Sequence, residues 1–230
     1  MHRRDPGILL DGVIIGRTAF ANTRKYVAIT TSANLGNMIS MAIASVILPF
    51  LPLLAKQILV NNFLSSLPLM AVSGDRVDPN ILERAGGWNF GHLLRVMLGF
   101  GLVISLFDGV TFFVLLAVFD AGEALFHTGW FVESLLTELI IVGVMRTQKP
   151  FYSSLPSPLL SFITLLVMVV AIALPYSPLA PLLGFQALAP TLMLGLGAIV
   201  IVYGLTSELL KYRLGSFQLP RLPAWTKTRS

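Results

Sequence analysis

The sequence predicts an all-α, polytopic membrane protein with six transmembrane helices and both termini in the cytoplasm. Of the 230 residues, 55% are hydrophobic and only 12% are charged, and the mean hydropathy is +0.81. Because about 25% of the residues of a typical soluble protein are charged, this composition indicates a surface that faces lipid. The lengths of the apolar segments and the positions of the basic residues then predict the topology.

Six apolar segments come close to the length of about 20 residues that a helix needs to cross the hydrocarbon core of a bilayer. The second segment is the least hydrophobic and contains Pro68, whereas Pro49 and Pro52 mark the turn after the first segment. The predicted spanning helices are 26–49, 57–74, 94–119, 126–145, 158–175 and 187–209.

The basic residues indicate the orientation of these helices. Fifteen of the sixteen lysines and arginines lie either before the first predicted helix or after the second, fourth or sixth one. Only Lys56 lies on the opposite side of the membrane. Cytoplasmic loops of membrane proteins carry the excess of basic residues, so both termini are predicted to be cytoplasmic. The net charge of +5 is therefore attributed to membrane topology, and nucleic acid is not an expected partner.

Polar side chains occur in the middle of several predicted helices, where they are costly unless they face protein or water. Asparagines and serines on the first two helices are spaced three or four residues apart, which places each pair on one helix face. Amide and carboxylate oxygens are ligands that hard cations such as Mg²⁺ prefer. We therefore expect a partial or vestigial cation site formed by Asn34, Asn37, Asn62, Ser66, Asp108 and Glu133.

Other interpretations of these polar residues stay open. Asparagine and serine often only hold membrane helices together, for about 0.6–2 kcal/mol each. Asp108 and Glu133 have no basic residue near the centre of any predicted span, so they are protonated, reach water or hold a cation. Further oxygens come from Asn61, Ser65 and Glu138, close by in the sequence.

The remaining candidate residues receive structural interpretations. Trp88 and Trp130 are expected to anchor helices at the membrane interface, and His127 is expected to be interfacial, because no second histidine is placed to bind a metal with it. The chain has no cysteine. No cofactor is expected apart from Mg²⁺ as a bound or transported ion.

Three stretches have a specific pattern: GDRVDPNILERAGGWN, LFDGVTFFVLL and HTGWFVESLLT. In order and spacing, about residues 8–213 resemble the C-terminal membrane half of magnesium-transporting P-type ATPases, their fifth to tenth helices. The resemblance implies a cytoplasmic stalk at 1–25, a six-helix membrane domain at 26–210 and a cytoplasmic tail at 211–230. It also implies a bacterial inner membrane as the location.

The resemblance assigns roles to several residues. Asn34 and Asn37 would line the ion site of the family, and Asn62 matches a family asparagine on the next helix. Ser66 stands where the family typically has an aspartate, since this chain reads NFLSS in place of a pattern like NLLYD. The loss of that charge leaves a bound divalent cation less well compensated.

The motifs with which the family phosphorylates itself, DKTGT, TGD and GDGxND, do not occur in the sequence. The chain alone is therefore not expected to be an enzyme. The first hypothesis is a non-catalytic transmembrane subunit that packs against other integral membrane proteins in the bilayer. The alternative is the membrane half of a split Mg²⁺ pump. A passive channel and a part of a complete pump are further alternatives.

Overall fold

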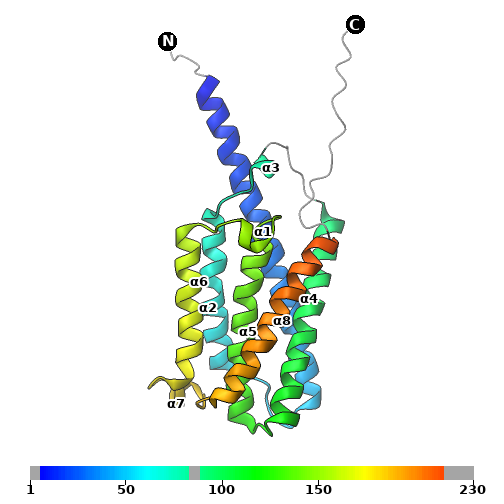
Figure 1. Ribbon diagram of the computed structural model, residues 1–230, viewed down its shortest axis with the longest axis vertical. Helices are drawn as coiled ribbons and strands as arrows, with labels where there is room; N and C mark the ends of the chain where they lie inside the picture. Colours follow the sequence, from blue (N-terminus) through cyan, green and yellow to red (C-terminus); the bar gives the residue numbers. More distant parts are fainter. Residues whose placement is uncertain (1–5, 83–88, 215–230) are drawn as a thin grey trace.

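The computed structural model describes residues 6–82 and 89–214, which form helices and turns without any strand (Figure 1). Six long helices make up a bundle, and two short helices lie at its ends. The helices are α1 (Pro6–Ile47), α2 (Ala55–Ala71), α3 (Pro79–Leu82), α4 (Phe90–Phe113), α5 (Glu123–Met145), α6 (Pro158–Ala173), α7 (Ala180–Leu183) and α8 (Pro190–Leu214).

All six predicted helices are present in the described chain, and five of them are long and apolar enough to cross a membrane: α1, α4, α5, α6 and α8. The helix α2 has 17 residues and continues into a three-residue 3₁₀ turn, Val72–Gly74. The prediction of an all-helical membrane protein is therefore confirmed, whereas the structure by itself supports five spans.

The first helix begins much earlier than predicted, at Pro6 and not at residue 26. No proline lies between Pro6 and Pro49 to interrupt it. Its 42 residues correspond to a length of about 63 Å, roughly twice the hydrocarbon thickness of a bilayer. Its first part consequently extends beyond the bundle (Figure 1).

Local capping signals determine where two of the helices begin. The side chain of Asn89 accepts a hydrogen bond from the backbone N–H of His92 at the start of α4. The hydroxyl of Ser157 accepts one from the N–H of Leu160, and Pro158 occupies the first position of α6. Both caps satisfy backbone donors that a helix start leaves without an internal partner.

The helix α5 forms the centre of the bundle and contacts α1, α2, α4, α6 and α8. In its most apolar window 89% of the residues are buried, compared with 22% for α6 and 28% for α8. The polar groups of α5 therefore lie inside protein, while the outer helices turn apolar side chains toward lipid.

The helices α1 and α4 pack closely against each other at Gly36. A Cβ atom on Gly36 would lie 2.6 Å from both Cβ and Cγ2 of Ile104 and 3.0 Å from the carbonyl oxygen of Gly101. These are rigid parts of α4. Glycine at this position therefore allows the two helices to pack closely.

Gly36→Ala is expected to lower the free energy of unfolding by about 1–3 kcal/mol, because the added methyl group forces α1 and α4 apart. Thermal unfolding of the purified chain in detergent would measure the effect. Gly109→Ala is the matched control on α4, since nothing lies within 4 Å of its Cβ position. Equal melting temperatures for the two variants would contradict the proposed close packing.

Candidate cation site

Three carboxylates lie inside the bundle: Asp108 on α4 and Glu133 and Glu138 on α5. Their exposed fractions are 1%, 0% and 8%. The ion pairs of the described residues include none of the three. Buried carboxylates without a basic partner need a proton or a cation. This acidic cluster, Asp108, Glu133 and Glu138, is therefore the candidate site.

The layer around Glu138 is built from amides. Asn37 Nδ2 of α1 donates to Glu138 Oε1 at 2.5 Å, and Asn61 Nδ2 of α2 donates to the same oxygen at 3.3 Å. The nearby Ser65 is buried as well, and its hydroxyl donates to the carbonyl of Asn62 at 3.4 Å. The Oδ1 atoms of Asn37 and Asn61 are buried without a hydrogen-bond partner, so they are available as ligands.

The layer around Asp108 has different partners. Ser40 Oγ donates to Asp108 Oδ2 at 2.5 Å, and Trp130 Nε1 donates to Asp108 Oδ1 at 3.0 Å. Glu133 faces Asp108 and Thr111, but its two oxygens form no hydrogen bond with acceptable geometry, and neither does the Thr111 hydroxyl. Asp108 is thus held in place, and Glu133 is left uncompensated.

The structure brings together only part of the predicted set. Asn37, Asp108 and Glu133 lie in or beside the cluster. Asn34 and Asn62 are exposed on the outer surfaces of α1 and α2, away from the acidic cluster. Ser66 is half-buried, and its hydroxyl donates to the carbonyl of Phe63 at 2.7 Å.

The inward face of each helix explains these positions. On α2 the buried residues are Asn61 and Ser65, one position before the predicted Asn62 and Ser66. On α1 the inward face contains the predicted Asn37 and also the buried Ser40. Ser40 was not among the predicted site residues. The spacing of three residues between Asn37 and Ser40 is a usable helical signal.

Two structural interpretations need correction. Trp130 does not anchor the interface, because only 2% of it is exposed and its indole donates to Asp108. His127 is buried as well, with Nε2 2.6 Å from the carbonyl oxygen of Leu51. Both residues are enclosed because α5 is surrounded by other helices. Trp88 lies outside the described residues.

The donor set limits which cation would fit. Within 6–82 and 89–214, no three histidine, aspartate or glutamate side chains are grouped to hold a metal ion. Any cation here therefore needs amide and hydroxyl oxygens in addition to one or two carboxylates. That combination suits a hard cation such as Mg²⁺, which is often bound by few protein carboxylates.

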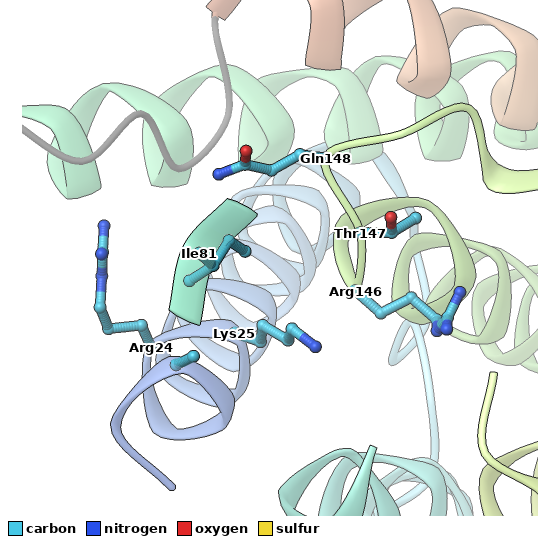
Figure 2. Close-up of a pocket in the computed structure, with 7 residues that line it drawn as sticks. Arg24, Lys25, Ile81, Arg146, Thr147 and Gln148 are labelled. Carbon is cyan, nitrogen blue, oxygen red and sulfur yellow. The ribbon is translucent and has the colours of Figure 1, made fainter. Parts of the chain in front are cut away.

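A second buried cluster closes one end of the bundle. Asp75, after α2, accepts hydrogen bonds from Arg146 Nε at 3.0 Å, Lys25 Nζ at 3.5 Å and the backbone N–H of Ser157 at 2.9 Å. Lys25 and Arg146, drawn in Figure 2, line a small cavity. Its volume of about 10 Å³ is room for about one water molecule. We call Asp75, Lys25 and Arg146 the ionic clamp, because it ties α1, α5 and the start of α6 to one loop.

Comparison with known proteins identifies the family. The family described as "Cation transporting ATPase, C-terminus" matches residues 50–213, which run from the end of α1 to the end of α8. The chain belongs to this cation-transporting ATPase family. The acidic cluster therefore lies in the part of the chain that is similar to the C-terminus of cation-transporting ATPases, as the resemblance implied.

Individual relatives are bacterial cation pumps. The chain is 41% identical over 209 residues to the magnesium-transporting ATPase, P-type 1, of Escherichia coli K12, which covers 89% of this chain. It is 34% identical over 227 residues to a protein of the same description from Salmonella typhimurium LT2, covering 96% of this chain. A calcium-transporting ATPase of Bacillus subtilis is 27% identical over 198 residues, covering 80% of this chain.

The matched part of these cation-transporting ATPases is small. The chain spans 23%, 25% and 22% of the three relatives, respectively, or about a quarter of their length. The family and the apolar helices together establish an integral membrane protein.

Proposed function

We propose that the chain is the cation-binding membrane part of a magnesium-type P-type transport system. In this proposal, the first membrane helices and the ATP-hydrolysing domains of the system are supplied by polypeptide segments outside these 230 residues. The observation that carries this proposal is the acidic cluster, whose buried carboxylates lie beside unpartnered amide oxygens and form no ion pair with any described basic residue. Two of the relatives are magnesium-transporting ATPases, which suggests Mg²⁺ as the ion.

We place this part in the bacterial inner membrane with six crossings and both ends in the cytoplasm. Support comes from the start of α1 and the end of α8, which lie at the same end of the bundle (Figure 1). Such an arrangement requires an even number of crossings. The helix α2 runs alongside α6 in the bundle and is the proposed sixth span. The excess of basic residues at one end then indicates the cytoplasmic side.

The exposed amides support a partner protein. Asn34 and Asn62 are exposed on helices that otherwise present apolar side chains such as Met38 and Phe63. Polar side chains within a membrane usually face protein or water. Membrane helices of a partner that cover the outer surfaces of α1 and α2 would satisfy both amides.

A non-catalytic accessory subunit is the second candidate. Ser66 favours it, because a hydroxyl that is bonded to the Phe63 carbonyl replaces the charge expected from the family at this position. In that case the bundle acts as a scaffold for other membrane proteins and transports no ion.

Capture of the chain from its native membranes tests the two candidates. A tag on the chain, mild detergent and mass spectrometry would identify the proteins that remain bound. A partner with a DKTGT phosphorylation motif would support the transport part. A stable assembly made only of membrane proteins without that motif would overturn it in favour of the accessory subunit.

Glu138→Gln is expected to reduce ATP-dependent Mg²⁺ uptake into vesicles made from the native membranes at least about tenfold. It removes a negative charge from the acidic cluster, and a loss of 1.4 kcal/mol in cation binding corresponds to a factor of ten. The substitution keeps the size of the side chain. Glu123→Gln is the control on the same helix, because Glu123 is 54% exposed. Unchanged uptake with Glu138→Gln, at equal protein levels, would contradict a role for the cluster in transport.

A further inference from the structure

We propose that Asp108, Glu133 and Thr111 form a second cation site, separate from the site around Glu138. The inference rests on the proposed function only in its choice of Mg²⁺ as the probe. The ligand is a small hard cation that is held between α4 and α5, without any contribution from α2.

The two layers lie apart along the bundle. Glu133 and Glu138 are five residues apart on α5, which is about 7.5 Å along the helix axis. Asn37 and Ser40 follow the same order along the antiparallel α1, and they bond to Glu138 and Asp108, respectively. Within the described part of the chain, no residue donates a hydrogen bond to both layers.

Charges and hydrogen bonds are unevenly distributed in the layer of Asp108, Glu133 and Thr111, which we call the outer layer. Each oxygen of Asp108 accepts one hydrogen bond, whereas neither oxygen of Glu133 accepts any. The two carboxyl groups face each other, and both are buried. A bare pair of buried negative charges is strongly unfavourable, so a cation or a shared proton belongs between them.

Thr111 provides an independent ligand. The Thr111 hydroxyl is 0% exposed, has no hydrogen-bond partner and faces Glu133. A buried hydroxyl without a partner is costly in a folded protein. Its oxygen, together with those of Glu133 and Asp108, supplies the hard ligands that Mg²⁺ prefers.

Trp130 provides a direct optical reporter, because its indole N–H donates to Asp108. In the full chain with Trp88→Phe and Trp225→Phe, Trp130 is the only tryptophan that remains. Mg²⁺ is titrated into this protein in phosphatidylcholine nanodiscs, at constant ionic strength and pH. We expect a saturable change in Trp130 emission.

Matched variants then locate the site. Glu133→Gln is expected to weaken Mg²⁺ binding at least about tenfold, and Thr111→Val about two- to tenfold. The exposed Glu123→Gln is expected to leave the affinity within about threefold, because this side chain lies outside the acidic cluster. Circular dichroism and the melting temperature confirm that each variant is folded, and Thr111→Val alone decides if Glu133→Gln does not fold.

Three results would overturn the inference. Equal losses with Glu133→Gln and Glu138→Gln would mean one shared site. A Trp130 signal that follows pH but not Mg²⁺ would assign a shared proton to Asp108 and Glu133. The absence of any saturable signal would exclude the site. The uptake assay is separate: normal binding at Trp130 with no uptake would refute the proposed transport function and leave the second site standing.

Discussion

Replacing Asp75 by asparagine is expected to lower the free energy of unfolding by about 3–5 kcal/mol, because it leaves two buried basic groups without their counter-charge. The side chains of Asp75, Lys25 and Arg146 are 0%, 4% and 2% exposed, respectively. Asparagine keeps the shape and one acceptor oxygen but removes the charge. Chemical unfolding of the purified chain in detergent micelles would measure the loss.

The control for this prediction is Asp120→Asn. Asp120 is exposed and has a φ of 45°, a conformation that asparagine tolerates as well as aspartate. Adding Arg146→Met to Asp75→Asn should cost less than Arg146→Met costs in the native chain, since the two residues form one pair. A loss below about 1 kcal/mol for Asp75→Asn would show that the ionic clamp contributes little beyond a surface ion pair.

Trp130→Ala is expected to destabilise the chain by about 3–5 kcal/mol through lost packing. The indole lies edge-on to Phe112, with ring centroids 4.8 Å apart, and 6.2 Å from the ring centroid of Phe126. The substitution also removes the donor to Asp108, which adds the cost of a buried acceptor that loses its partner.

Trp130→Phe separates the two contributions, because it keeps an aromatic ring and removes only the N–H group. We expect a loss of about 1–3 kcal/mol for this variant. Phe113→Ala is the matched control, since 65% of Phe113 is exposed on α4. Thermal unfolding would measure the loss of stability in the three variants. A loss for Trp130→Ala no larger than the loss for Phe113→Ala would reject the proposed packing role.

The positions of the helices could be predicted from the sequence because apolar segments of membrane length are a strong local signal. The inward face of each helix could not. Asn34 and Asn37 are about 60° apart around the helix axis, and the edge of the buried face of α1 falls between them. Which of the two points inward depends on where α5 packs, and a spacing of three residues does not contain that information.

The same reason explains the error at Trp130. A single tryptophan near the end of a helix usually indicates a membrane interface. Here the helix that carries it is the central one, so neighbouring helices enclose the indole. The ionic clamp was missed because Asp75 meets Lys25, Arg146 and Ser157 across 50, 71 and 82 residues of sequence, and no local pattern connects them.

Because α1 is a single uninterrupted helix, it can tilt as a rigid unit about a fixed point. The ionic clamp holds it at Lys25, which lies about 28 Å from Pro6 and about 18 Å from Asn37 along the axis. With Lys25 as the fulcrum, a sideways displacement of about 3 Å at Pro6 moves Asn37 by about 2 Å in the opposite direction. Such a step exceeds the tolerance of a hydrogen bond, so tilting the outer arm would detach Asn37 from Glu138. Because Gly36 packs against rigid parts of α4, α4 would have to move together with α1.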